Sequence, residues 1–316
     1  MKIVVAGANG LIGKALVRAL SERGDEVTAL VRREQAVPFA KAVLWDGRGE
    51  GPWTAAVEGS DAVVNLAGAN VADHRWSDAF KREILESRTH STGAVVEAIR
   101  RAKARPHVLV NASAVGYYGG RGDDPVDESA PPGTDFLAGV VKAWEEAARR
   151  ADVRTVLLRT GIVLARDGGA LAKVLPPFKA FVGGPIGNGR QWMPWIHLDD
   201  EVSAILWTID HQELQGPVNL TAPNPVTMGD FAKALGKVLH RPSWAKVPGA
   251  ALKAVLGEFA TVLVEGQRAV PLALQRTGFA FRFNEIAAAL EDLFGHRASR
   301  VAAASKAPSA SSTSTS

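Results

Sequence analysis

Hydrophobic positions along the chain follow two alternating patterns. Short apolar runs that end at glycine or at a polar residue alternate with longer stretches in which apolar residues recur every three or four positions. The short runs are typical of buried parallel strands, and the longer spacing is typical of amphipathic helices. The predicted strands are 3–6, 26–31, 42–45, 61–67, 107–111 and 154–158, and the predicted helices between them are 10–23, 77–103 and 135–150. This alternation predicts an α/β fold with a doubly wound parallel sheet and helices on both faces.

The pattern changes after about residue 165. Residues 183–189 are mostly glycine and proline and predict a loop. Residues 202–207 and 228–239 predict helices, and residues 217–220 predict a strand. We expect a larger domain over residues 1–165 and a smaller C-terminal α/β lobe over residues 166–295, with an exchange of elements between them left open. The Ala-, Ser- and Thr-rich residues 302–316 predict a disordered tail, because they bury little apolar surface.

Composition excludes several classes of site. The 316 residues are 47% hydrophobic and 22% charged, as in ordinary globular proteins, and the net charge of +4 is not concentrated in one block. Nucleic-acid binding usually needs a concentrated basic stripe, so we expect no nucleic-acid partner. The chain has no cysteine, which excludes disulfides and thiolate chemistry. Its seven histidines show no metal-binding spacing, and we expect no metal.

The sequence predicts no membrane-spanning segment. No apolar run approaches the ~20 residues that a membrane-spanning helix needs. The first residues read as a strand and lack the pattern of a signal peptide. We therefore expect a soluble, cytoplasmic protein without a membrane partner. The sequence does not set its oligomeric state.

Three glycines lie between the first predicted strand and the first predicted helix. Gly7, Gly10 and Gly13 form G-x-x-G-x-x-G. A helix N-terminus offers unpaired N–H groups to a pyrophosphate, and glycine lets the backbone approach it. The turn predicts a Rossmann-type dinucleotide site made by Gly7, Asn9, Gly10, Leu11, Ile12 and Gly13. The alternative is a tight strand-to-helix turn without a ligand.

The end of the second strand favours one dinucleotide over the other. NAD sites commonly place a carboxylate there for the ribose hydroxyls, but this strand ends in Val31, Arg32 and Arg33. A guanidinium pairs with a 2′-phosphate that a carboxylate would repel. The sequence therefore predicts NADP(H), with Arg32 as the main contact beside Val31. The alternative is a pair of solvated arginines.

Several longer segments resemble a known family. They are DAVVNLAG at 61–68, FKREILESR at 80–88, SAVGYYG at 113–119, WIHLDD at 195–200 and EGQR at 265–268. With the glycine turn, they make residues 1–295 resemble the extended short-chain dehydrogenases/reductases, in particular an atypical subgroup of NAD(P)-dependent epimerase/dehydratase-like "epimerase family" proteins. The resemblance implies further cofactor contacts from Leu66, Ala67, Glu83, Arg88 and Val163. The alternative for Glu83 and Arg88 is a pair of charges on a helix surface.

The catalytic pattern of that family is broken here. Its active members use a Ser or Thr and a Tyr with a Lys four residues later, the Tyr exchanging a proton with the substrate. The resemblance places Lys142 correctly, but position 138 is alanine, which cannot transfer a proton. Tyr117 and Tyr118 are the only tyrosines and could replace the missing phenol, or could pack as a structural pair. Ser113 could orient a substrate oxygen or merely satisfy the backbone, and Lys142 could bind ribose without acid–base work.

The smaller lobe offers one more candidate region. Trp192, Trp195 and His197 follow the glycine-rich loop, which could close over a substrate. In the alternative, Trp195 belongs to the core and His197 caps the helix that starts near Asp199.

Two functions remain open from the sequence. The first is an NADP(H)-dependent oxidoreductase or epimerase-like enzyme that acts on a small polar, sugar-like molecule through Ser113 and Tyr117 or Tyr118. The second is a non-catalytic NADPH-binding sensor or scaffold, which Ala138 favours. The fold alone does not choose between them.

Overall fold

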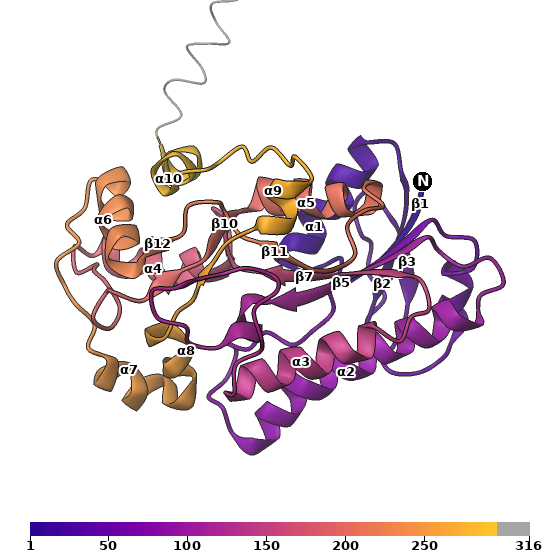
Figure 1. The fold of residues 1–316 in the computed structure, drawn as a ribbon, viewed down its shortest axis with the longest axis horizontal. Helices are drawn as coiled ribbons and strands as arrows, with labels where there is room; N and C mark the ends of the chain where they lie inside the picture. Colours follow the sequence, from indigo (N-terminus) through magenta and orange to yellow (C-terminus); the bar gives the residue numbers. More distant parts are fainter. Residues whose placement is uncertain (296–316) are drawn as a thin grey trace, which may run out of the picture.

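The computed structural model describes residues 1–295, so the predicted tail at 302–316 lies outside the described residues. A seven-stranded, all-parallel sheet forms its centre (Figure 1). The strand order is β11-β7-β5-β4-β1-β2-β3, in which the direction of winding reverses at β1. The strands are β1 (Lys2–Ala6), β2 (Glu26–Val31), β3 (Lys41–Leu44), β4 (Ala62–Asn65), β5 (Val108–Ala114), β7 (Arg154–Thr160) and β11 (Gly216–Leu220). The predicted α/β, Rossmann-like architecture is confirmed.

Alternate side chains of β1 face opposite helical layers. Ile3 and Val5 pack in one core with α1 (Leu11–Glu22) and α5 (Leu198–Asp210). Val4 and Ala6 pack in the other core, with α2 (Asp78–Arg101) and α3 (Phe136–Ala148). The two helical layers lie on opposite sides of the sheet in Figure 1. Both faces of the strand are therefore buried, as its continuous apolar run predicts.

The helix starts show why these segments become helical. The Ser77 hydroxyl accepts a hydrogen bond from the N–H of Phe80 at 3.2 Å, and the Asp135 carboxylate accepts one from the N–H of Ala138 at 3.1 Å. Such side-chain caps satisfy N–H groups that would otherwise lack a partner. In contrast, the N-cap residue of α1 is Gly10, which has no side chain to cap the helix. The first N–H groups of α1 are therefore left for another acceptor.

The main sheet takes one strand from beyond residue 165. β11 pairs in parallel with β7, with Gly216 opposite Val156, and forms the edge of the sheet. The chain thus leaves the sheet after β7, builds other elements and returns.

Seven further elements form a smaller layer beside β7 and β11. Its core includes Phe178, Trp195, Phe231 and Leu290. The elements around this core are β8 (Ile162–Leu164), α4 (Gly169–Lys179), β9 (Trp192–Met193), β10 (Trp195–His197), β12 (Val226–Thr227), α6 (Met228–Leu239) and α10 (Ile286–Phe294). The others are η1 (Pro52–Ala56), η2 (Val115–Tyr118), β6 (Pro125–Val126), α7 (Gly249–Leu256), η3 (Gly257–Phe259), α8 (Ala260–Val264), β13 (Arg268–Ala269) and α9 (Leu272–Arg276). None of the helices in residues 1–295 combines the length and the apolar character that crossing a membrane requires.

Candidate functional site

The glycine turn between β1 and α1 is too tight for side chains. A Cβ on Gly13 would lie 2.2 Å from the carbonyl oxygen of Gly7, and a Cβ on Gly7 would lie 2.7 Å from the carbonyl of Leu66. Gly7 also has φ of +81°, in the left-handed region that favours glycine. The N–H of Gly10 donates to the carbonyl of Gly7 at 3.0 Å and closes the turn. The bare turn, the uncapped start of α1 and the absence of an acidic residue in its first turn suit an anion.

A cavity of about 980 Å³ opens in front of this turn. Its walls come from the carboxyl ends of the central strands and from one side of α2. They include residues 7–10, 30–33, 45–48 and 66–69. Pockets of this kind form at the point where the winding of a parallel sheet reverses, and the size suits a large ligand.

Eight of the predicted cofactor residues line this cavity: Gly7, Asn9, Gly10, Val31, Arg32, Leu66, Ala67 and Glu83. The other five are not among the residues that line it. Ile12 and Val163 pack against the hydrophobic core, and Leu11 contacts the Gly168–Gly169 backbone. Gly13 packs on Gly7, and Arg88 lies behind the wall. Their part in cofactor binding stays a prediction.

Three arginines line one end of the cavity. Arg32 and Arg33 follow β2, and Arg48 comes from the loop after β3. None of the three forms an ion pair within the described part of the chain. The sequence reasoning missed Arg48. The feature that could have identified Arg48 is its position just after β3. This strand pairs in parallel with β2, so the two strands end side by side.

One carboxylate at this end of the cavity is turned toward its own loop. Asp46 Oδ1 accepts hydrogen bonds from the backbone N–H groups of Arg48 at 2.8 Å and Gly49 at 3.1 Å. These hydrogen bonds lower the pKa of Asp46 and keep it ionised. They also fix the loop that carries Arg48 beside the cavity.

Buried amide groups hold the end of β4 at the cavity. The Asn65 side chain donates to Asn111 Oδ1 at 2.8 Å and to Thr92 Oγ1 at 3.0 Å. Its Oδ1 accepts from the N–H of Ala67 at 3.2 Å. This network fixes the Leu66–Ala67 backbone, which forms part of the wall.

Arg88 is a largely buried cation next to that wall. Its guanidinium lies 5.0 Å from the Trp144 ring centroid, and its side chain packs against Gly68. Nη1 donates to the carbonyl of Ile84 at 3.0 Å, but no carboxylate pairs with Arg88 in residues 1–295. Burial lowers the pKa of Arg88 to about 10, so the side chain remains charged at neutral pH. A buried cation without an anion suits an anionic ligand nearby.

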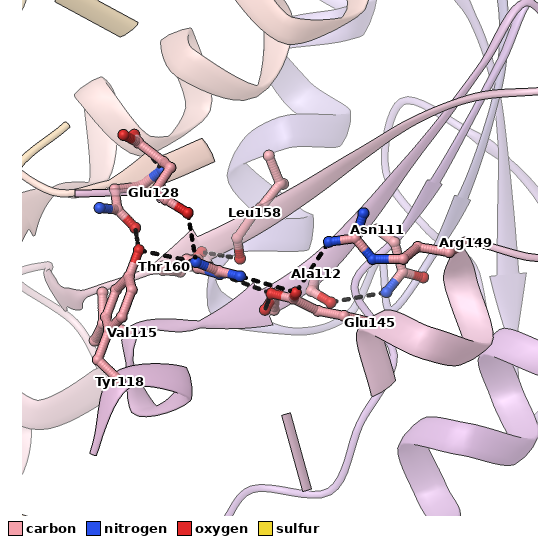
Figure 2. Close-up of polar contacts among 12 residues, drawn as sticks. Asn111, Ala112, Val115, Tyr118, Glu128, Glu145, Arg149, Leu158 and Thr160 are labelled. Carbon is pink, nitrogen blue, oxygen red and sulfur yellow. Dashed lines mark hydrogen bonds and ion pairs between the residues drawn. The ribbon is translucent and has the colours of Figure 1, made fainter. Parts of the chain in front are cut away.

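The candidate catalytic residues Ser113 and Tyr118 belong to a buried network. Figure 2 shows Glu145 of α3 and Tyr118 of η2 on opposite sides of this network, with Arg149 beyond Glu145. Ser113 Oγ donates to Glu145 at 2.7 Å, and both Glu145 oxygens accept from Arg159, at 2.8 and 3.0 Å. The Tyr118 hydroxyl accepts from Arg159 at 3.1 Å and donates to Asn219 at 2.6 Å.

These contacts leave Ser113 and Tyr118 little freedom. Ser113 is 4% exposed and Tyr118 is fully buried. Burial raises the pKa of Tyr118 to about 12. Neither residue lines the cavity. The geometry therefore favours structural roles for both, which was the alternative left open for each.

Tyr117 and Lys142 lie in different surroundings. Tyr117 is half-buried, with the Arg159 guanidinium 3.5 Å from its ring centroid, and its hydroxyl has no hydrogen bond to any described residue. Lys142 is exposed and lies 3.9 Å from Glu146. Neither lines the cavity, and Ala138 is fully buried. The structure thus does not bring Lys142 together with a phenol in the pattern that the family uses.

The aromatic residues of the smaller lobe divide between core and surface. Trp195 is fully buried. His197 Nδ1 accepts from the N–H of Asp199 at 3.1 Å, at the start of α5. Core packing of Trp195 and helix capping by His197 are therefore what the structure shows. Trp192 is half-buried and donates to Asp123 at 2.8 Å.

Comparison with known proteins extends these findings. Residues 3–220 match the model of the NAD dependent epimerase/dehydratase family, and residues 247–293 match a domain of unknown function, DUF1731. The "Epimerase family protein SDR39U1 homolog, chloroplastic" of Arabidopsis thaliana is 45% identical over 301 residues, which cover 92% of this chain and 86% of the relative. The "Epimerase family protein ML0860" of Mycobacterium leprae is 44% identical over 292 residues, which cover 91% of this chain and 94% of the relative.

Solved structures show the same relationship. The crystal structure of human epimerase family protein SDR39U1 (isoform 2) with NADPH superimposes with a TM-score of 0.86 at 35% identity, covering 93% of this chain and 99% of the human chain. A UDP-glucuronic acid 4-epimerase from Bacillus cereus has a TM-score of 0.75 at 16% identity and shares the fold alone. As the motifs predicted, the chain belongs to the NAD dependent epimerase/dehydratase family and is similar to the SDR39U1 group within it.

Proposed function

We propose that this protein binds NADP(H) in the cavity at the carboxyl edge of the sheet, in preference to NAD(H). The observation that carries the proposal is the pairing of a bare glycine turn with three arginines that lack carboxylate partners. The turn and the start of α1 would hold the pyrophosphate, and Arg32, Arg33 and Arg48 would hold the 2′-phosphate. The NADPH named with the human relative supports the same choice.

The residues present fit this cofactor. A Cβ at Gly7 or Gly13 would collide with the backbone of the turn. Arg88 supplies a second, buried positive charge behind Gly68, near the wall formed by Ser87 and Ser91. Asp46, the carboxylate between the arginines, is held by backbone N–H groups instead of facing a ribose.

We further propose that the protein is an oxidoreductase or epimerase-like enzyme that acts on a small polar, sugar-like molecule. The cofactor would supply a hydride at its nicotinamide ring. Tyr117 is the phenol left to move the proton, because Tyr118 donates its hydrogen to Asn219 and is buried. Arg159 beneath the Tyr117 ring would fix its orientation.

A second function is favoured by one observation. Ala138 occupies the position of the family's tyrosine and is fully buried, and Lys142 is exposed. A protein that binds NADPH without turnover, as a sensor or scaffold, would need neither group. The two functions share the cofactor site and differ only in the role of Tyr117.

Calorimetric titration with NADPH and NADH tests cofactor choice. We expect tighter binding of NADPH, and Arg32→Ala should weaken NADPH binding without affecting NADH. Equal affinities in the unaltered protein, or no loss for NADPH in Arg32→Ala, would remove the basis for NADP(H).

Turnover is tested by NADPH oxidation across a panel of polar carbonyl compounds, including keto sugars. If the protein is an enzyme, we expect it to oxidise NADPH, and we expect Tyr117→Phe to abolish this oxidation while NADPH binding is unchanged. Tight binding of NADPH with no oxidation across the panel would favour the sensor or scaffold. NADPH oxidation that persists in the Tyr117→Phe variant would mean that another group donates the proton to the substrate.

A further inference from the structure

Two segments of the smaller lobe carry basic residues and no acidic ones. Residues 168–198 contain three lysines or arginines and residues 231–257 contain five, and neither segment contains Asp or Glu. The segments lie side by side, because the N–H of Ala245 donates to the carbonyl of Gly183 at 3.1 Å and the N–H of Gly187 donates to that of Val247 at 2.9 Å. Their helices α4, α6 and α7 gather at one end of the molecule, on the left in Figure 1.

An exposed apolar patch lies where the two segments meet. It consists of Phe181, Val182 and Trp244, which are 53%, 50% and 69% exposed, and we call it the aromatic tip. The Trp244 indole donates to the carbonyl of Phe181 at 3.2 Å, and the Arg241 guanidinium lies 4.3 Å from the Phe181 ring centroid. Clustered exposed apolar side chains of this size mark interaction surfaces.

The backbone at the aromatic tip favours a different residue. Phe181 follows the end of α4 with φ of +64°, in the left-handed region. Asparagine and glycine adopt this conformation readily, whereas a bulky aromatic residue is strained there. A phenylalanine at this turn therefore carries a conformational cost that asparagine or glycine would not.

The solvent face of α4 next to the tip has the same character. Its exposed residues in the last turn are Pro176, Pro177 and Lys179. Lys179 precedes Phe181 by two residues, and Lys246 follows Trp244 by two. Cationic side chains thus flank the aromatic tip on both segments.

We propose that this surface docks on an anionic lipid bilayer. Trp and Phe side chains favour the interfacial region of a bilayer, and lysines and arginines beside them bind anionic headgroups. Phe181, Val182 and Trp244 enter the interface, and Lys179, Arg241 and Lys246 contact the headgroup phosphates. A second copy of the chain would bring the same basic segments together, and like charges would repel.

This docking needs no membrane-spanning segment. The sequence-based expectation of no membrane partner rested on the lack of a spanning run. A peripheral contact uses exposed side chains of a folded lobe. The proposal is independent of cofactor binding, because none of its residues lines the cavity in front of the glycine turn.

Co-sedimentation with lipid vesicles tests the proposal. The full chain is mixed with vesicles of phosphatidylcholine alone or of phosphatidylcholine with about one third phosphatidylglycerol, a composition chosen to carry a negative surface potential. We expect binding to the anionic vesicles only, weakened by raising the salt concentration. Phe181→Asn and Trp244→Ser should each lower partitioning roughly fivefold, and Lys179→Glu with Lys246→Glu at least about tenfold.

A matched control is available in another turn, between β2 and β3. Phe39 is 61% exposed and has φ of +68°, so Phe39→Asn makes the same change in the same backbone conformation away from the tip. Phe39→Asn should leave vesicle binding unchanged, and near-UV circular dichroism should show that every variant keeps its fold. The proposal is overturned if the unaltered protein does not bind anionic vesicles at low salt, or if the tip and control variants bind equally. A dimer seen by light scattering that Phe181→Asn dissociates would assign the tip to a second copy instead.

Discussion

Replacing Tyr118 with phenylalanine removes a single oxygen atom from the buried network around Arg159. That oxygen donates to Asn219 Oδ1 at 2.6 Å and accepts from Arg159 Nη1 at 3.1 Å. Arg159 Nη1 keeps the carbonyl of Glu128 at 3.2 Å as a second acceptor, whereas Asn219 Oδ1 is left without a donor. An orphaned buried acceptor costs about 1–3 kcal/mol, so we expect the free energy of unfolding to fall by about 2 kcal/mol.

Urea denaturation followed by tryptophan fluorescence measures this loss. With an unchanged dependence on urea, about 2 kcal/mol lowers the midpoint concentration, and it lowers Tm by roughly 3 °C for a chain of this size. Tyr117→Phe is the matched control, because the Tyr117 hydroxyl has no hydrogen bond to any residue in 1–295. We expect its free energy of unfolding to change by less than about 0.5 kcal/mol.

The comparison of the two variants decides between the roles of the tyrosines. Equal destabilisation of Tyr117→Phe would mean that the loss is not specific to the buried hydroxyl. If Tyr118→Phe is as stable as the unaltered protein, then the buried network does not depend on the Tyr118 hydroxyl. Tyr118 would then be available again as an acid–base group.

Three further substitutions probe the glycine turn, the arginines and a buried carboxyl. Gly13→Ala should lower Tm and abolish NADPH binding, since its Cβ would meet the Gly7 carbonyl at 2.2 Å; thermal unfolding and titration check both. Arg48→Ala should weaken NADPH binding about three- to tenfold in calorimetry and leave NADH unchanged, because an exposed charge pair contributes about 1 kcal/mol. Burial raises the pKa of Glu201 from 4.5 to about 8. The free energy of unfolding therefore contains the full contribution of the protonated carboxyl below pH 4.5, and this contribution is lost as the pH rises through 8. Glu201→Gln should therefore match the unaltered protein in urea denaturation at pH 4.5 and exceed it at pH 9, by at most about 5 kcal/mol.

Each of these expectations has an outcome that contradicts it. Wild-type affinity in Gly13→Ala would mean that the turn adapts to a side chain. An equal loss for NADPH and NADH in Arg48→Ala would place that arginine away from the 2′-phosphate. A stability difference between the unaltered protein and Glu201→Gln that stays constant across the pH range would mean that folding does not raise the pKa of Glu201.

The parts of the molecule that were predictable from the sequence depend on local patterns. The strand of residues 3–6, the glycines after it and the spacing of α1 lie within about twenty residues, and each is decided by its own neighbours. The caps Ser77 and Asp135 likewise act within three residues of the helix starts. Arg32 was found because it follows β2 directly.

The rest depends on contacts between distant residues. Tyr118 reads as a free phenol in the sequence, and its partner Asn219 lies 101 positions away. Arg48 joins Arg32 only because β3 pairs with β2. Helix α4 was not predicted, because Pro176 and Pro177 lie inside it and proline usually ends a helix. In each of these cases the structure is decided by tertiary packing, because the local sequence preference is either ambiguous or favours a different structure.

The position of β11 at the edge of the main sheet constrains how the protein is made. On the ribosome, β7 is synthesised some sixty residues before its outer neighbour, which pairs with it from Gly216 onward. Until then β7 presents an unpaired row of N–H and C=O groups, the kind of edge that invites pairing with other chains. Most strands of the sheet that carries the cofactor cavity are thus synthesised early, but the sheet is complete only after β11 is made. A nascent chain released before residue 220 would expose the edge of β7 to aggregation.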